Sequence, residues 1–177
     1  YEVGTVARVI QILRASNSMM RVVMEGGSRA RLRRLWQREP FLQPQVELIG
    51  EEKSPRHGTR TEAMLRETYA RFGEYSELLP KQPESIFTTV MAAPARGVLA
   101  DFIAPHSHLR YQDKQSVLEE LRPLMRLRRV NEILKREISV IAMEQDIESK
   151  VRERVGQIHK DMILREQVKV RQNQLGE

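Results

Sequence analysis

An apolar stripe at helical spacing in the last third of the chain constrains this fold more than any other feature. Nine of its ten positions are apolar, and Glu144 is the one acidic interruption. The apolar members are Val130, Leu134, Ile138, Ile141, Ile147, Val151, Val155, Ile158 and Met162. Their mean spacing of about 3.6 residues is the period of an α-helix. Because Pro123 suits the first turn of a helix, we predict one helix from Pro123 to Gln174, about 78 Å long.

An apolar stripe on so long a helix needs a partner surface. Three pairs of the same helix are spaced to form ion pairs on a solvated face: Glu132 with Arg136, Asp146 with Lys150, and Glu148 with Arg152. The stripe therefore favours bundle or coiled-coil packing and contacts between subunits over a ligand groove. The residues that we assign to helix packing and assembly are Ile138, Ile141, Ile147, Val151, Val155 and Ile158. A helical oligomerisation scaffold is accordingly one candidate function.

The first fifty residues have the composition and alternation of β-strands. Runs at residues 3–13, 19–24, 28–35 and 41–49 are separated by turn-forming residues, which is typical of a small antiparallel meander. The pair Gly26 and Gly27 predicts a break after the second run, and Pro44 confines the last run to a sheet edge or a bulge.

A polar linker separates this β-rich region from helical sequence. Helical patterns follow at residues 59–79, 84–92 and 94–103, and another begins at Asp113. We therefore predict an α+β fold with a partial antiparallel β subdomain, a helical bundle and a very long C-terminal helix. The predicted divisions are residues 1–50, a linker at 51–58, the bundle at 59–122 and the long helix at 123–177.

Composition excludes several classes of function. The protein of 177 residues has no Cys, so it has no disulfide framework and no cysteine nucleophile. None of its nine glycines precedes a Lys, so it contains no phosphate-binding loop of the Gly-Lys type. No apolar run reaches the roughly 20 residues of a membrane helix. His106 and His108 are the closest histidine pair, and a loop after Pro105 suits them better than a metal site. We predict no catalytic residue, bound cofactor or metal.

A cluster of arginines is the strongest argument for a nucleic-acid partner. Residues 1–50 carry 8 basic and 4 acidic side chains, a net charge of +4. The cluster consists of Arg29, Arg31, Arg33, Arg34 and Arg38, with Trp36 among them. Guanidinium groups bind phosphates and an aromatic ring stacks on bases, so a nucleic-acid-binding module is an alternative function. The other interpretation is the polar face of one strand that runs into a loop.

Large apolar side chains near the same strands are candidates for contact with polypeptide. They are Met19, Met20, Met24, Trp36, Phe41 and Leu42. A binder that tolerates many sequences needs an adaptable apolar surface, and Met side chains adapt well to different partners. Packing in a core is the more common fate of each residue.

Four segments, in order along the sequence, resemble the N-terminal region of the Lon ATP-dependent protease family. They are Tyr1–Ala7 (YEVGTVA), Val23–Arg31 (VMEGGSRAR), Asp113–Glu119 (DKQSVLE) and Leu164–Lys169 (LREQVK), with Leu175–Glu177 (LGE) closing the last one. One departure is Met162-Ile163, where many members carry two tyrosines. The family region begins with further strands, so we expect this sequence to hold only the later part of the β subdomain. The last of the four segments ends the family's long helix, so we expect an ATPase module to follow.

The resemblance implies a function for this region and the absence of catalytic residues from it. It implies a non-catalytic region that recognises unfolded or tagged protein substrates and supports the assembly of a cytoplasmic, homohexameric protease of protein quality control. The ATP and Mg²⁺ site and the Ser–Lys proteolytic pair of such a serine endopeptidase are expected beyond residue 177. No catalytic residue carries over to this sequence, and the resemblance implies no membrane partner.

Overall fold

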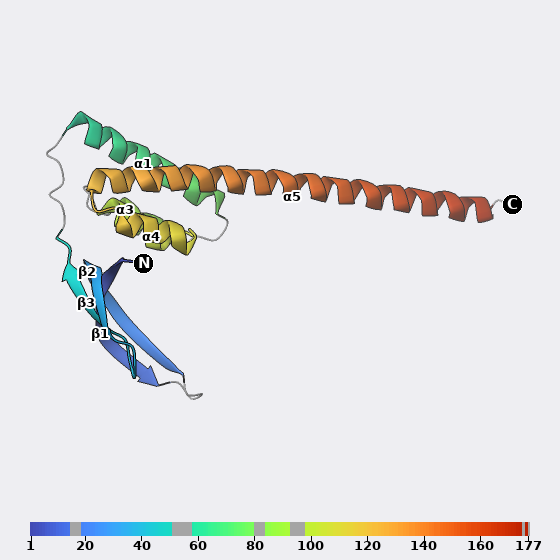
Figure 1. Ribbon diagram of the computed structural model, residues 1–177. Coiled ribbons are helices and arrows are strands. Elements are labelled where there is room, and N and C mark those ends of the chain that lie inside the picture. Colours follow the sequence, from blue (N-terminus) through green and yellow to red (C-terminus); the bar gives the residue numbers. More distant parts are fainter. Residues whose placement is uncertain (15–18, 51–57, 80–83, 93–97, 175, 177) are drawn as a thin grey trace. The chain divides into compact units, whose positions relative to one another are not determined.

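A computed structural model describes residues 1–14, 19–50, 58–79, 84–92, 98–174 and 176. Within these residues, three strands precede five helices (Figure 1). The strands are β1 (Val3–Arg14), β2 (Met20–Gln37) and β3 (Gln43–Leu48). The helices are α1 (Thr59–Leu78), α2 (Glu84–Met91), α3 (Leu99–His106), α4 (Tyr111–Glu119) and α5 (Pro123–Gln174). The predicted α+β fold is confirmed.

The sheet is antiparallel throughout, with strand order β1-β2-β3. The central strand β2 is one strand of 18 residues where the sequence indicated two, so the predicted break at Gly26 and Gly27 is wrong. Gly27 and Ser28 lie together opposite the single residue Val6 of β1, which is the two-against-one geometry of a β-bulge. The glycines bend the strand without ending it.

The prediction for Pro44 is confirmed. It lies in β3 opposite Leu35 of β2, and β3 is an edge strand of the sheet. Proline has no backbone N–H to donate to a further strand, and an edge strand needs none on its outer side.

The apolar core lies among the helices. Its members from α1 to α3 are Phe72, Tyr75, Val90, Leu99, Ala100, Ile103 and Ala104, all buried. Leu109 between α3 and α4, Val117 of α4, and Leu127, Val130, Ile133 and Leu134 of α5 are also buried. Phe72 also stacks on Phe87, with ring centroids 6.3 Å apart. The sheet adds only Val3 and Ala30 to the buried apolar residues, so most of its apolar side chains are exposed.

The described residues separate into two compact units, residues 1–134 and residues 135–177. In the second unit, α5 continues as an unbroken helix to Gln174, as the apolar stripe predicts. Every side chain described between residues 142 and 173 is exposed. The division into predicted subdomains stays a prediction, and residues 51–57 of the predicted linker lie outside the described residues. Within the described residues, no helix is both long enough and apolar enough to cross a membrane.

Candidate functional site

The hairpin of β1 and β2 exposes apolar side chains along both strands. Val9 lies opposite Met24, and Ile12 lies opposite Val22. Residues directly opposite each other on antiparallel strands share a face, so each pair forms a small apolar unit. More than half of the Val9, Ile12 and Met24 side chains is exposed. The hairpin therefore presents an apolar surface, which we call the hairpin surface and define by Val9, Ile12, Val22 and Met24.

The six apolar residues predicted to contact polypeptide are all exposed, with exposed fractions between 62% and 68%. Met20 and Met24 lie in the first half of β2, Met19 directly precedes that strand, and Trp36 lies near its end. Phe41 and Leu42 follow in the segment between β2 and β3. Core packing, which is the more common fate of such residues, is not observed for any of the six. Their role in binding stays a prediction.

The arginine cluster does not form one free basic face. Arg29 is ion-paired with Asp101, and Arg33 with Glu47 of β3. The guanidinium carbon of Arg34 lies 4.5 Å from the centre of the Trp36 ring, a cation–π contact. Arg31 is half-buried and Arg38 is exposed. Two carboxylates thus reduce the positive charge that this cluster offers to phosphates.

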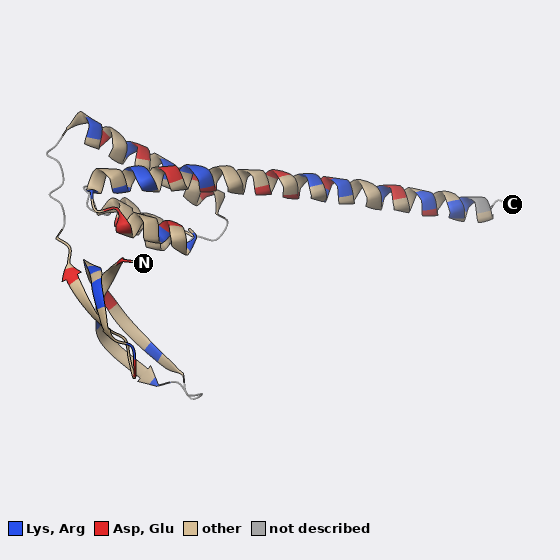
Figure 2. Ribbon diagram, viewed as in Figure 1, with Lys and Arg blue, Asp and Glu red and all other residues tan. Residues whose placement is uncertain are grey.

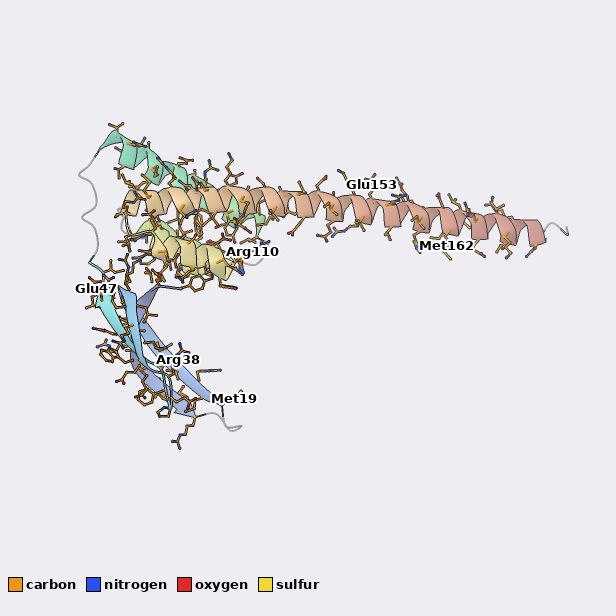
Figure 3. The ribbon with its side chains drawn as sticks, viewed as in Figure 1. Met19, Arg38, Glu47, Arg110, Glu153 and Met162 are labelled. Atoms are coloured by element: carbon orange, nitrogen blue, oxygen red, sulfur yellow. The ribbon has the colours of Figure 1, made fainter. Side chains whose placement is uncertain are left out.

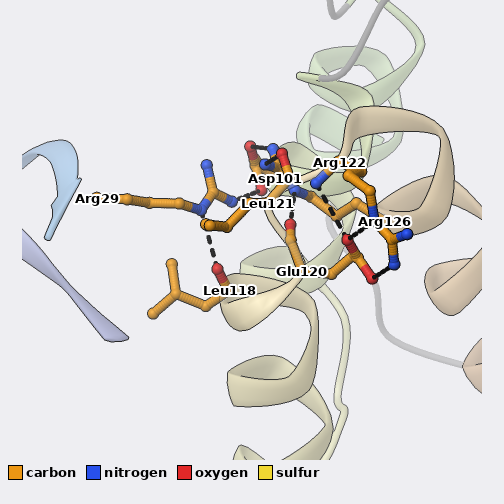
Figure 4. Close-up of polar contacts among 7 residues, drawn as sticks. All are labelled: Arg29, Asp101, Leu118, Glu120, Leu121, Arg122 and Arg126. Carbon is orange, nitrogen blue, oxygen red and sulfur yellow. Dashed lines mark hydrogen bonds and ion pairs between the residues drawn. The ribbon is translucent and has the colours of Figure 1, made fainter. Parts of the chain in front are cut away.

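Arg29 instead belongs to a polar network that joins the sheet to the helices (Figure 4). Its Nη2 donates to Oδ1 of Asp101 in α3 at 2.5 Å, and its Nε donates to the backbone carbonyl of Leu118 in α4 at 3.0 Å. Gln115 of α4 adds a hydrogen bond from its Nε2 to the carbonyl oxygen of Val3 in β1, at 2.8 Å. These contacts tie the sheet to α3 and α4.

The second carboxylate oxygen of Asp101 accepts a hydrogen bond from another arginine, Arg126. Nη1 of Arg126, in the first turns of α5, donates to Oδ2 of Asp101 at 2.6 Å. The Arg126 side chain is 2% exposed, and it also donates to the backbone carbonyls of Glu120 and Leu121. Burial of a charge is costly unless it is paired and hydrogen-bonded, and Arg126 meets both conditions. Sequence analysis identified neither Asp101 nor Arg126 as a member of such a network.

The connection between α4 and α5 carries a further carboxylate. Nε and Nη2 of Arg122 donate to the two oxygens of Glu120, and the backbone N–H of Arg122 also donates to Oε1. These hydrogen bonds to the Arg122 side chain and backbone lower the pKa of Glu120 below its ordinary value of 4.5, against the opposing effect of partial burial. Glu120 is therefore ionised at neutral pH, and its ion pair with Arg122 lies directly before the first residue of α5.

His106 and His108, the closest histidine pair in the sequence, each make a separate hydrogen bond within the domain. Nδ1 of His106, the last residue of α3, lies 2.7 Å from the carbonyl oxygen of Phe102. The backbone N–H of His108 donates to the hydroxyl of Tyr75 at 2.9 Å. Pro105 lies inside α3, so the loop predicted after it begins only beyond His106. Across the described part of the protein, no group of three or more potential ligands is arranged to hold a metal ion.

A groove of about 1000 Å³ lies between the hairpin and the helices α3 and α4. The strands contribute Met24, Gly26 and Gly27 to its lining, and the helices contribute Tyr111 and Lys114. The Arg29–Asp101 pair also lines it. Sequence analysis singled out Met24 but missed Tyr111, whose local sequence resembles an ordinary helix surface. Lys114 lies in the segment DKQSVLE that resembles the family, but sequence analysis gave it no binding role.

The second unit presents the predicted stripe on a mixed-charge helix. Lys150 is ion-paired with Asp146 and Arg152 with Glu148, so these two predicted pairs form. Arg136 of the third predicted pair is ion-paired with its neighbour Glu137. Figure 2 shows positive and negative residues interspersed along this helix, and Figure 3 shows side chains such as Glu153 and Met162 projecting from it. Of the predicted assembly residues, Ile138 and Ile141 are half-buried, and Ile147, Val151, Val155 and Ile158 are exposed. Their role in assembly stays a prediction.

The fold and surface define an α+β domain in which polar contacts hold an open sheet to a helical core. Residues 1–136 match the family described as the ATP-dependent protease La (LON) substrate-binding domain. The chain belongs to this family. The resemblance drawn from its sequence motifs is thereby confirmed.

Comparison with individual Lon proteases supports the same assignment along the whole sequence. The chain is 36% identical over 179 residues to the Lon protease of Syntrophomonas wolfei and 34% identical over 177 residues to that of Brevibacillus choshinensis. All of the chain is covered in both comparisons, but only 22% of each relative. The chain therefore spans about a fifth of the length of these relatives.

A solved structure supports the fold. The N-terminal domain of the Mycobacterium avium complex Lon protease superposes with a TM-score of 0.61, and the match covers 76% of this protein and 70% of that one. Sequence identity over the match is 20%, so the likeness concerns the fold alone.

Proposed function

We propose that this protein captures unfolded or tagged polypeptide for a Lon-like ATP-dependent protease of protein quality control. The observation that carries the proposal is the hairpin surface, where apolar side chains of β1 and β2 lie exposed in opposed pairs. Large exposed apolar patches on soluble domains are typical of interaction sites. Membership in a family described by substrate binding supports the same role.

The chemistry of the hairpin surface suits a partner of variable sequence. Unfolded polypeptides differ in sequence but share exposed apolar side chains, so their binding is driven mainly by the hydrophobic effect. Met24 has a flexible, polarisable side chain that packs against many shapes. Its neighbours Val9, Ile12 and Val22 are stiff, so they hold the rest of the surface in place at small entropic cost.

The experiment that tests this proposal compares two ligands at two salt concentrations. A permanently unfolded model protein and a short DNA duplex are each titrated against the protein in low and moderate salt. We expect the unfolded protein to bind with little dependence on salt, because apolar burial is only weakly screened. Absence of binding to the unfolded protein contradicts the proposal.

The same experiment decides the nucleic-acid alternative. Binding to DNA alone, with a steep loss of affinity as salt rises, would favour a module that uses the arginine cluster. The variant R31E/R38E removes the two arginines of that cluster for which no carboxylate partner or ring contact is described. Loss of DNA binding in this variant would show that the arginine cluster is the DNA-binding site.

We further propose that residues 1–177 have no ATPase or peptidase activity of their own. The parent protein would be a serine endopeptidase that binds ATP and Mg²⁺ outside residues 1–177. This division of labour is supported by membership in the substrate-binding family. Hydrolysis of ATP or of a casein substrate by the purified protein, above that of a heat-denatured control, would contradict it.

We also propose that the stripe on α5 supports assembly of a cytoplasmic homohexameric parent. Ile147, Val151, Val155 and Ile158 are exposed at helical spacing, and an exposed apolar stripe of this kind is buried when helices associate. Sedimentation equilibrium of the protein over a wide concentration range is the test. We expect self-association that the variant V151E/I158E abolishes, whereas a monomer at all concentrations would contradict a role in assembly.

A further inference from the structure

We propose that the groove between the hairpin and helices α3 and α4 binds an extended polypeptide segment in which a carboxylate lies beside an apolar side chain. A free carboxyl terminus on an apolar last residue supplies this chemistry, and so does an acidic side chain next to an apolar one. The inference rests on the proposed function, since it assigns part of the captured polypeptide to a defined place on the domain.

The size and walls of the groove suit a strand of polypeptide. Its volume of about 1000 Å³ is at the upper end of the range for small-molecule sites, which leaves room for several residues. Gly26 and Gly27 contribute backbone and no side chains to one wall. Met24 and Tyr111 are exposed by 62% and 67%, so they offer apolar area on both the strand side and the helix side. An apolar side chain of the ligand would be buried between them.

The charges that line the groove favour an anion. The lining includes Arg29 and Lys114 as cations and Asp101 as its carboxylate. Asp101 is divided between two guanidinium groups, because Arg126 binds its second oxygen. The two guanidinium groups carry more positive charge than the Asp101 carboxylate carries negative charge, and Lys114 adds a further positive charge. The local electrostatic complement of this lining is a carboxylate.

Lys114 is the residue placed to receive that carboxylate. Its Nζ donates to the carbonyl oxygen of Pro105 at 3.2 Å, which fixes the ammonium group at the groove. A lysine ammonium has three donors, so donors remain for a ligand. Tyr111 precedes Lys114 by three residues on α4, so both side chains lie on the same face of the helix. An apolar contact and a charge contact are therefore offered side by side.

The test uses three fluorescent decapeptides of the same apolar composition with the intact protein. One has a free C-terminal carboxylate, one is C-terminally amidated, and one is amidated but carries a glutamate next to its last apolar residue. We expect the first and third peptides to bind about three- to tenfold more tightly than the second, because a partly buried ion pair contributes that much. Tighter binding of only the first peptide would assign the groove to free carboxyl termini.

The variants locate the effect. K114Q removes the proposed charge contact, and K160Q removes an exposed lysine of α5 as a matched control. We expect K114Q to abolish the preference for carboxylate and K160Q to leave it unchanged. Y111A should weaken all three peptides alike, and thermal unfolding confirms that each variant is folded.

The outcomes separate this inference from the proposed function. Equal binding of all three peptides, or a carboxylate preference that survives in K114Q, overturns the inference. Binding of unfolded protein by the same preparation would still leave the proposed function standing. Failure to bind either the peptides or the unfolded protein overturns both.

Discussion

Arg29 of β2 and Asp101 of α3 are 72 residues apart in sequence, yet the guanidinium and carboxylate groups meet at 2.5 Å. Because Arg126 shares the same carboxylate, one side chain anchors both the sheet and the start of α5. The Arg29 side chain is 12% exposed, so this ion pair is shielded from solvent and from salt far more than a surface pair.

Removal of Asp101 should be the most damaging single change in this network. In D101A the buried Arg126 loses the carboxylate that its Nη1 binds, and breaking a buried ion pair from one side costs about 3–5 kcal/mol of the free energy of unfolding. The matched control R33A breaks an exposed pair with Glu47 and should cost less than about 1 kcal/mol. Urea denaturation measures both, and equal losses would show that Asp101 does not hold the domain together.

The two neighbouring glycines of β2 should differ in their tolerance of a side chain. A Cβ at Gly27 would lie 3.2 Å from the carbonyl oxygen of Val6, whereas one at Gly26 would lie 3.6 Å from a methyl group of Thr5. We therefore expect G27A to lower stability by about 1 kcal/mol through crowding of the backbone, and G26A to be near neutral. Chemical denaturation of the pair is the measurement. A larger loss in G26A would mean that the bulge is placed wrongly.

The wrongly predicted break in β2 at Gly26 and Gly27 shows which structural features local sequence cannot predict. The period of the apolar stripe predicted α5 because a helical period is local, and Pro44 marked an edge strand because a missing donor is a property of one residue. Whether Gly26 and Gly27 end a strand depends instead on the partner strand, where Val6 faces two residues. No local pattern contains that information.

The polar network was missed for the same reason. Arg29 looked like a phosphate ligand because its neighbours in sequence are basic, while the carboxylate that neutralises it lies in another element. Likewise, the exposure of Met24 and Trp36 could not be predicted, because the amount of apolar surface left uncovered depends on how many elements pack against the sheet.

Acid should weaken the domain partly through Glu120. The pKa of this carboxyl is lowered by its hydrogen bonds to Arg122, so its contribution to stability is present above its ordinary pKa of 4.5 and is lost as pH falls through the lowered value. We expect E120Q to lower stability at pH 7 by about 0.5 kcal/mol, because Arg122 is largely exposed. The difference from the unsubstituted protein should shrink below pH 4.5. If the stability difference between E120Q and the unsubstituted protein stays constant from pH 7 to pH 3, ionisation of Glu120 is not its cause.

Gly156 is a removable weak point of α5. It lies inside the helix with open space around the position of a Cβ, and glycine costs about 1 kcal/mol relative to alanine in a helix interior. G156A should therefore raise the helical content measured by circular dichroism and delay the melting of this segment. Reduced helicity would show that the glycine is required by a contact that this helix makes.

The central claim is that the hairpin surface captures unfolded polypeptide, and one affinity measurement tests it most directly. The variant V9T/M24T removes apolar groups from an opposed pair while it keeps residues that favour strands. The control V168T/V170T makes two comparable changes at exposed positions of α5. We predict that V9T/M24T binds a permanently unfolded protein about tenfold more weakly than the unsubstituted protein does, as expected for the loss of about two buried methyl or methylene groups. Unchanged affinity in V9T/M24T, or an equal loss in the control, would contradict the account.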